Sequence, residues 1–558
     1  MRVQYKKKWF MLDLASQRSF CRKEVEDLLC VLEKCGYNGI GLYLAGAFKF
    51  PEFGGFLHEG CMSPEDAAWI KEQAAKRGMS VMPMTNLYTN AETFLAQEKF
   101  QKFMLTKADP LPIYDVLHKR VATRNAFDIT AEGFMEFALS VVDQLVEVFR
   151  PEFLHLGGND VTLETEEDKR NHAVFFTALA EHLNKKGVRA AIWGDTIQKY
   201  YTVAQLLTKD ITVFDWNYYG HKYGTSHKLK RLGFNDIVAC PGTQSWSGVV
   251  ATQHVGPDAD LMTRWKLNVA PDEVEAFLRD TAAIDIDNAM LCDWGNYYGT
   301  LLWNGMHQIA RFGQYVNCKP TDDEVLSQTL FGRQTPYMQA MQALMEAQYN
   351  YSKEYSKLPG NVKAEKHETA AIFNVDALKN TIIYGSVFSP EVVEGFANAA
   401  DKAKGLSEGW TAASDIEARC KKSLAFAACY AEAMAVVLRL AGETKKVHRE
   451  AAPLQYTEPQ KYSELIKKEQ SDFYAAAGKV DGWIDALREA ITDTGHTAED
   501  LDRLAETKKR FESLAKVLDY FDVGGVDYNN EIALVDWAQL VFEAFGVVYP
   551  YTYSYMEH

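Results

Sequence analysis

Residues 153–160 read Phe-Leu-His-Leu-Gly-Gly-Asn-Asp. The first four residues form a mostly apolar run, which is typical of a short buried strand. Two glycines follow, and glycine allows the unusual dihedral angles and close backbone approach that a strand tip beside a ligand needs. Asn159 and Asp160 then place an amide next to a carboxylic acid, a pair suited to gripping a polar substrate and moving a proton. The alternative interpretation is a plain strand followed by a turn.

Apolar runs and amphipathic patterns alternate on both sides of this stretch. The runs predict eight strands, at 9–15, 39–44, 80–84, 152–157, 189–193, 211–216, 237–240 and 289–294. The patterns between and after them predict helices, the clearest at 22–35, 131–149, 166–186 and 271–283. Eight strand–helix units in about 300 residues favour an α/β fold of the (β/α)8 TIM-barrel class, with its site at the carboxyl ends of the strands. A doubly wound sheet is the alternative, but no phosphate-binding loop follows the first strand.

The pattern changes beyond residue 318. Apolar residues recur at helical spacing, most clearly over 414–440 and 463–491. We therefore expect two domains, a catalytic barrel at 1–318 and a helical C-terminal domain at 319–558. The helical domain could buttress the barrel, lend a side chain to its cleft, or join two copies of the chain in a homodimer.

Composition narrows the class of protein. The 558 residues carry a formal net charge of -16, so no electrostatic footprint for nucleic acid is expected. No stretch approaches 18 uninterrupted apolar residues, and the N-terminus lacks the apolar core of a signal peptide, so neither a membrane span nor export is expected. The nine cysteines show no metal-ligand spacing and resemble the reduced core cysteines of a cytoplasmic protein. We expect no cofactor and no metal, although the many Asp residues leave a metal-dependent hydrolase open.

Five predicted strands end in polar and aromatic residues. The tips read Asn159-Asp160, Trp193-Gly194-Asp195, Asp215-Trp216-Asn217-Tyr218-Tyr219, Thr243-Gln244-Ser245-Trp246 and Asp293-Trp294-Gly295-Asn296-Tyr297. In a barrel these tips converge on one mouth, where indole rings and hydrogen-bonding groups would surround a deep site. A carbohydrate ring, with apolar C–H faces and equatorial hydroxyls, fits such a site. For any single Trp, packing in the core is the competing interpretation.

The motif at 155–160 resembles the His-x-Gly-Gly-Asp-Glu signature of glycoside hydrolase family 20, the β-N-acetylhexosaminidases. The similarity covers residues 8 to about 310. Residues 8–13 resemble the first strand of the family, Tyr43 to Pro51 its second strand and loop, and 77–83 its third strand. Trp193-Gly194-Asp195 and Asp293-Trp294-Gly295-Asn296 resemble the ends of its fifth and eighth strands.

The resemblance implies a substrate-assisted reaction, in which the acetamido oxygen of the sugar attacks the anomeric carbon. By position, Asp160 would be the general acid and Asn159 would hold the acetamido group. The other residues implied to contact or support the substrate are Lys8, His155, Trp193, Asp195, Asp215, Trp216, Tyr218, Trp246, Asp293, Trp294 and Asn296. Among these, the indoles of Trp193, Trp216 and Trp294 would wall the acetamido group.

The sequence departs from the family at five positions. Asn159 stands in place of Asp, and a neutral amide cannot stabilise a forming positive charge as a carboxylate does. Asp160 stands in place of Glu and is one methylene shorter. Lys8 replaces an Arg that makes a bidentate contact, Ala45-Gly46 replaces Glu-Asp, and Asn90 replaces His.

Three interpretations remain open. The first is an exo-acting glycosidase on β-linked hexosaminides, with Asp160 as the acid. The second is a glycosidase on a sugar without an acetamido group, with Asp195, Asp215 or Asp293 as the second carboxylate. The third is a carbohydrate-binding relative without catalysis.

Overall fold

The computed structural model describes residues 4–15, 18–53, 60–105, 126–218, 225–243, 245, 248–251, 273–294, 301–355, 372–373, 378–379, 381–382, 388–451 and 453–518. It also gives the backbone of two short strands at 113–115 and 120–122. Every structural statement below concerns these residues.

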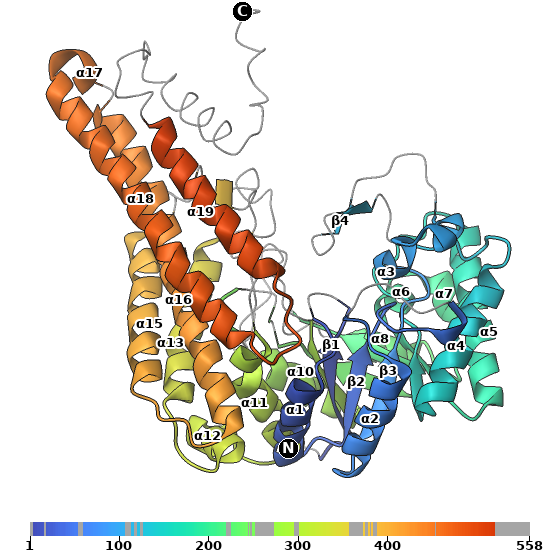
Figure 1. Ribbon diagram of the computed structural model, residues 1–558. Coiled ribbons are helices and arrows are strands. Elements are labelled where there is room, and N and C mark those ends of the chain that lie inside the picture. Colours follow the sequence, from blue (N-terminus) through green and yellow to red (C-terminus); the bar gives the residue numbers. More distant parts are fainter. Residues whose placement is uncertain are drawn as a thin grey trace, which may run out of the picture.

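Eight parallel strands close into a barrel (Figure 1). They are β1 (Lys7–Asp13), β2 (Gly39–Tyr43), β3 (Ser80–Met84), β6 (Phe153–His155), β7 (Arg189–Trp193), β8 (Thr212–Trp216), β9 (Ile237–Cys240) and β10 (Asn288–Asp293). Neighbours follow chain order, and β1 pairs with both β2 and β10 to close the ring. The predicted TIM barrel and its eight strands are thereby confirmed. The remaining pair, β4 (Ile113–Asp115) and β5 (Arg120–Ala122), forms a separate two-stranded excursion.

Helices follow the strands as the sequence predicts. The longer ones around the barrel are α1 (Arg22–Lys34), α2 (Pro64–Ala75), α4 (Phe134–Phe149), α5 (Glu166–Lys185), α8 (Thr225–Arg231), α10 (Glu273–Ala282) and α11 (Met306–Val316). The shorter ones are α3 (Glu92–Leu95), α6 (Asp195–Lys199) and α7 (Tyr201–Leu206), with 3₁₀ turns η1 (Pro51–Phe53), η2 (Glu98–Phe103) and η6 (Leu302–Gly305). Capping boxes at Ser63 and Thr165 satisfy the first amides of α2 and α5.

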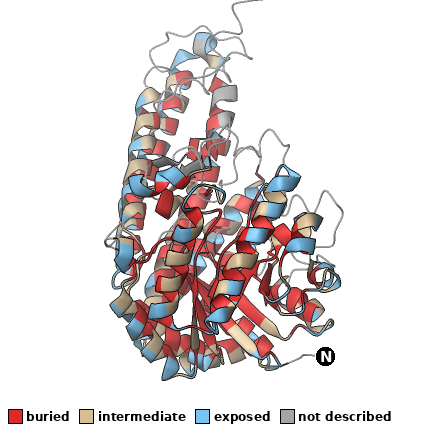
Figure 2. Cartoon of the chain, turned by 90° about the vertical axis from the view of Figure 1, so that its right-hand side faces the viewer, coloured by how far each residue is buried: buried red, intermediate tan, exposed pale blue. Residues whose placement is uncertain are grey.

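Each strand buries both of its faces. Alternate side chains, among them Trp9, Met11 and Phe214, fill the barrel interior, and their neighbours pack against the surrounding helices. Figure 2 shows the strands as buried and the outer helix faces as exposed. This alternation decides which residues at a strand tip can face the mouth.

The chain then continues into a helical C-terminal region that rises beside the barrel (Figure 1). Its helices are α12 (Asp323–Phe331), α13 (Tyr337–Tyr355), α15 (Pro390–Glu408), α16 (Asp415–Ala451), α17 (Leu454–Thr457), α18 (Pro459–Ala490) and α19 (Glu499–Val517). Within α16, residues 415–444 are long and apolar enough to cross a membrane by length and composition. Most of that stretch is buried against other helices, as in the core helix of a globular region.

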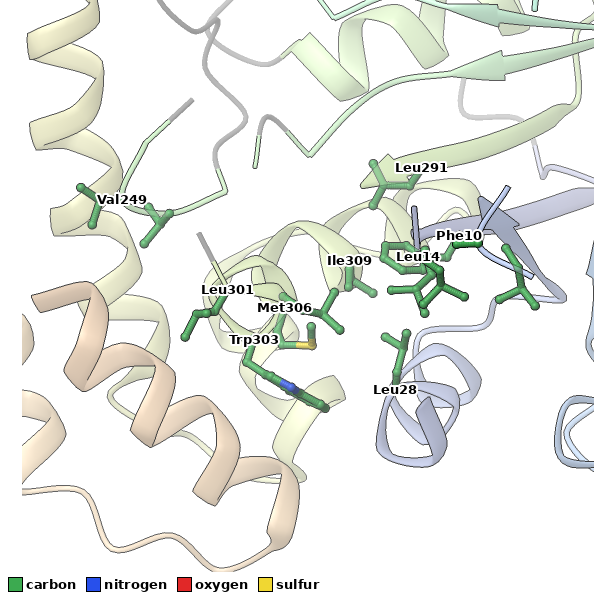
Figure 3. Close-up of a cluster of buried hydrophobic side chains, with 14 of the residues drawn as sticks. Phe10, Leu14, Leu28, Val249, Leu291, Leu301, Trp303, Met306 and Ile309 are labelled. Carbon is green, nitrogen blue, oxygen red and sulfur yellow. The ribbon is translucent and has the colours of Figure 1, made fainter. Parts of the chain in front are cut away.

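One apolar cluster joins the barrel to the helical region. Figure 3 shows Phe10 of β1, Leu28 of α1 and Leu291 of β10 close to Trp303 and Met306, which follow the last strand. The same cluster continues into the buried side chains of α13 and α16.

Candidate active site

Aromatic side chains from four strand tips, those of β2, β7, β8 and β10, meet at the barrel mouth. Trp294 lies at the centre, with its ring centroid 5.7 Å from that of Trp193 and 4.8 Å from that of Tyr43. Its indole Nε1 donates a hydrogen bond to the Tyr218 hydroxyl at 2.7 Å. Tyr218 in turn stacks on Trp216, with centroids 5.1 Å apart. The predicted aromatic wall is therefore assembled from residues that are far apart in the sequence.

Asn159 and Asp160 lie at this mouth, at the end of the β6 segment. The Asn159 amide Nδ2 donates to Asp160 Oδ2 at 2.7 Å. Because only the NH₂ end of an amide can donate to a carboxylate, this bond fixes the amide orientation. Asn159 Oδ1 then faces the other way and is buried without a hydrogen-bond partner. Asp160 is exposed and adopts a left-handed backbone with φ of 56°.

Asp195 connects the acid to the wall. Its Oδ2 accepts from the Asp160 backbone amide at 2.9 Å, and its Oδ1 accepts from Trp216 Nε1 at 3.3 Å. Burial raises the pKa of Asp195 to about 6, and the negative charge of Asp160 adds to that rise. Both carboxylate oxygens are thus engaged with the protein itself, whereas the family resemblance implies a hydroxyl-binding role.

His155 and Trp193 form the buried floor of the site. Their ring centroids lie 4.5 Å apart, and both side chains are fully buried. The Gly157 amide donates to His155 Nδ1 at 3.1 Å, so the imidazole carries its proton on Nε2. Burial lowers the pKa of His155 to about 3, which keeps the ring neutral. His155 Nε2 and Trp193 Nε1 are buried N–H donors without a hydrogen-bond acceptor.

The structure does not bring Lys8 to this cluster. Lys8 lies near the amino end of β1, and its Nζ donates to Asn317 Oδ1 at 2.8 Å. The mouth lies at the other end of the strand. The expectation that Lys8 contacts a sugar is therefore wrong. Lys8 lies in the stretch that resembles the first strand of the family, but its side chain points outward at the end of the barrel opposite the mouth.

Two predicted carboxylates turn away from the barrel interior. Asp215 follows the outward-facing Val213 on β8 and accepts hydrogen bonds from Gln198 at 2.7 Å and from Ser226. Burial raises its pKa to about 6.

Asp293 follows Leu291 on the outward face of β10 and accepts from Thr243 Oγ1 at 2.7 Å. Burial also raises its pKa. The expectation that Asp215 or Asp293 faces the substrate is therefore wrong, because side chains alternate along a strand and these two lie on the outward face.

Trp246 and Asn296 lie outside the described residues, so their predicted contacts stay predictions. Conversely, Asp13 is a site residue that the sequence reasoning left without a role. It is fully buried on the inward face of β1, with Trp9 and Met11 below it, and its Oδ1 accepts from the Ala15 amide at 2.9 Å. Asp13 is two residues from Met11 and four from Trp9, and this spacing along a strand could have predicted that it faces the barrel interior.

Asn86 is a second polar residue at the mouth that the sequence reasoning did not single out. It is fully buried beyond the end of β3, and its Nδ2 donates to the Tyr43 hydroxyl at 2.6 Å. In the part of the chain that the structure describes, no three His, Cys, Asp or Glu side chains are grouped to hold a metal ion.

Comparison with known proteins finds similarity to one family of glycosidases. The family model described as glycosyl hydrolase family 20, catalytic domain, matches residues 45–246. A β-N-acetylhexosaminidase structure from Bacteroides fragilis NCTC 9343 is 18% identical and covers 59% of this chain and 70% of its own, with a TM-score of 0.43. An N-acetyl-β-hexosaminidase from Streptomyces plicatus and one from Streptomyces coelicolor A3(2) are each 14% identical. Each match covers 60% of this chain and 68% of the other chain, with a TM-score of 0.44. No curated protein matches the sequence.

Proposed function

We propose that the protein hydrolyses β-linked N-acetylhexosaminides, because residues 45–246 match the model of the glycosyl hydrolase family 20 catalytic domain and include the motif at 155–160. Asp160 is the general acid in this proposal. The observation that carries it is the side-chain oxygen of Asn159, a buried acceptor with no donor, next to that acid. A buried acceptor left without a partner is costly, so such a group in a site calls for a ligand or water donor. The N–H of a 2-acetamido group is a donor of the right kind.

The floor of the site supports the same substrate class. His155 Nε2 and Trp193 Nε1 are N–H donors without acceptors, and both are buried. An acetamido group offers one N–H and one carbonyl oxygen, so it complements a site that holds both a buried acceptor and buried donors. The apolar indole walls of Trp193 and Trp294 suit its methyl group.

The chemistry follows from the acid and the acetamido group. The acetamido carbonyl oxygen forms a bond to the anomeric carbon, the glycosidic C–O bond breaks, and Asp160 gives its proton to the leaving oxygen. Water then opens the oxazolinium intermediate and returns a proton to Asp160. Asn159 can accept the acetamido N–H, but as a neutral amide it leaves the positive intermediate without a countercharge, which we expect to slow turnover by about 100- to 1000-fold relative to a carboxylate.

A sugar without the acetamido group is the second candidate. It would require a protein nucleophile or base, and the inward-facing Asp13 favours this candidate, because that buried carboxylate lies at the mouth. Asp195 is the other carboxylate beside Asp160.

The test is a panel of aryl β-glycosides with and without a 2-acetamido group. We expect cleavage of the acetamido members, with kcat reduced about 100- to 10,000-fold in Asp160→Asn while product binding is retained. Asn159→Ala should raise KM for acetamido substrates about tenfold, since it removes the acceptor. Cleavage confined to sugars without the acetamido group would favour the second candidate, and binding without cleavage would leave a carbohydrate-binding protein.

Exo action, a homodimer, a cytoplasmic location and the division into 1–318 and 319–558 stay predictions from the sequence.

A further inference from the structure

The loop that carries Asp160 has an unusual backbone. In this segment, residues 157–163, which we call the acid loop, Gly157 and Gly158 both have φ of 86° and Asp160 has φ of 56°. Left-handed dihedrals suit glycine but are disfavoured for a residue with a Cβ atom. Asp adopts such dihedrals more readily than most residues, and contacts from outside the acid loop add to the support of this conformation.

Two of these contacts come from the first turn of α6. Thr196 Oγ1 donates to the Gly158 carbonyl at 2.8 Å, and both residues are buried. Asp195 Oδ2 accepts from the Asp160 amide at 2.9 Å. Adjacent residues of α6 thus hold the acid loop two residues before the acid and at the acid itself.

The residue after α6 holds the other half of the acid loop. The Tyr200 hydroxyl accepts from the Leu163 amide at 2.9 Å and lies 3.4 Å from the Val161 carbonyl, to which it donates. Lys199 Nζ also donates to the Val161 carbonyl at 3.4 Å. The Nζ atoms of Lys169 and Lys199 lie 5.5 and 5.1 Å from the Tyr200 ring centroid, which fixes the ring.

We propose that residues 195–200, here called the clamp, position the general acid by binding the acid loop on both sides of Asp160, with Tyr200 and Thr196 as positioning residues. The catalytic part of this proposal rests on the proposed function, because it assigns Asp160 the role of acid. The hydroxyls of Tyr200 and Thr196 both bind acid-loop backbone. Their effect reaches the reaction through the placement of the Asp160 carboxyl.

The geometry separates positioning from simple folding. The Tyr200 hydroxyl makes hydrogen bonds to two backbone groups of the acid loop, so Tyr200→Phe removes those two bonds and keeps the ring and its contacts with Lys169 and Lys199. The barrel core is untouched. Tyr201 is the matched control, since it is the next residue, the same side chain, and 67% exposed.

The experiment combines amide hydrogen exchange of a peptide spanning the acid loop with steady-state kinetics on an aryl glycoside that the wild type cleaves. In Tyr200→Phe we expect exchange of the Leu163 amide to rise about tenfold, because that amide loses its acceptor. We expect kcat to fall about 10- to 100-fold with KM changed less than about twofold, since an acid displaced by about 1 Å affects the chemical step more than binding. Tyr201→Phe should match the wild type in both measurements.

A second pair of variants distinguishes a positioning role from a general loss of folding. Thr196→Val should repeat the loss of kcat, and Thr196→Ser, which keeps the hydroxyl, should restore it. The proposal is overturned if Tyr200→Phe and Tyr201→Phe exchange alike, or if faster exchange leaves kcat unchanged. If the wild type cleaves no glycoside, the proposed function fails, and the exchange measurement alone decides whether the clamp orders the acid loop.

Discussion

In the proposed reaction, Asn159 keeps one task that a carboxylate would have at its position and loses another. Its Oδ1 is a buried acceptor, so it can still bind a substrate N–H, while its Nδ2 donates to Asp160. A carboxylate could not make that donation, and two adjacent negative charges would repel each other. In that reaction the amide would orient the Asp160 carboxyl but contribute no negative charge to the transition state.

Asp195 gives the site a titration near pH 6. Burial raises its pKa to about 6, so the carboxyl is protonated below that pH and ionised above it. The ionised form is the better acceptor for the Asp160 amide and Trp216 Nε1, both of which donate to it. We expect kcat/KM to rise with pH through a limb near pH 6, measured as a pH–rate profile. Stability runs the other way, because an acid whose folded pKa is raised loses its stabilising contribution as pH rises from about 4 to about 6.

The matched variant is Asp195→Asn, which keeps the shape of the side chain and removes the titration. Its profile should lack the limb near pH 6 while activity is reduced throughout. A limb that persists unchanged in Asp195→Asn would assign the titration to another group.

The β6 tip tolerates only glycine at 157. A Cβ atom there would lie 2.7 Å from Asn86 Oδ1 and 3.0 Å from the Asn86 Cα atom, and φ is already 86°. We expect Gly157→Ala to lower the free energy of unfolding by about 2 to 4 kcal/mol, from left-handed strain together with overpacking. Urea denaturation measures this change.

Gly187 provides the control for that prediction. Its φ is 74°, and a Cβ atom would meet nothing within 4 Å, so Gly187→Ala should cost only the conformational part, about 1 kcal/mol. Equal losses in the two variants would show that Asn86 moves aside and that contact at the tip contributes nothing.

Strands were predictable because each is a short apolar run bounded by turn residues, and parallel strands buried on both faces carry that pattern strongly. The direction of the tip residues was harder. Asp215 and Asp293 both lie in apolar strands on the outward face shared with Val213 and Leu291, while Asp13 lies on the inward face of β1. A polar residue indicates where a strand ends. The direction of its side chain follows from the alternation along the strand, counted from residues known to face the barrel interior.

Contacts between separate strand–helix units could not be predicted at all. The clamp acts on a loop that follows β6, although the clamp itself follows β7. The sequence of neither segment indicates contact with the other. The two meet only because neighbouring strands of a closed barrel place their tips side by side. Lys8 shows the opposite limit, since similarity in sequence located a residue that the fold points away from the mouth.

The barrel and the helical region are joined by buried polar contacts as well as by the apolar cluster of Figure 3. Glu24 of α1 is the centre of this junction. Its Oε1 accepts from Trp303 Nε1 at 2.9 Å, and its Oε2 accepts from the Gly495 amide at 2.7 Å, in the turn between α18 and α19. Arg18 pairs with the same carboxylate at 3.4 Å, and all of these side chains are nearly inaccessible to solvent. The α18–α19 turn pairs with the segment after β1, where the Ser19 amide donates to the Gly495 carbonyl at 2.6 Å, so the junction lies beyond the carboxyl end of β1 (Figure 1).

Replacing Glu24 should therefore loosen the whole molecule. Glu24→Leu leaves the Arg18 charge, the Trp303 N–H and the Gly495 amide buried without an acceptor, so we expect a loss of about 3 to 5 kcal/mol in the free energy of unfolding. Lys23 is the matched control on the same helix, because its ion pair with Asp493 reaches the same turn at 2.9 Å but is 60% and 57% exposed. Lys23→Met should leave stability within the error of the measurement, since solvent screens such a pair. Calorimetry of the full chain tests both variants, and the junction has no role in stability if Glu24→Leu melts at the same temperature as Lys23→Met. A second transition in Glu24→Leu alone would show that this carboxylate couples the unfolding of the helices to that of the barrel.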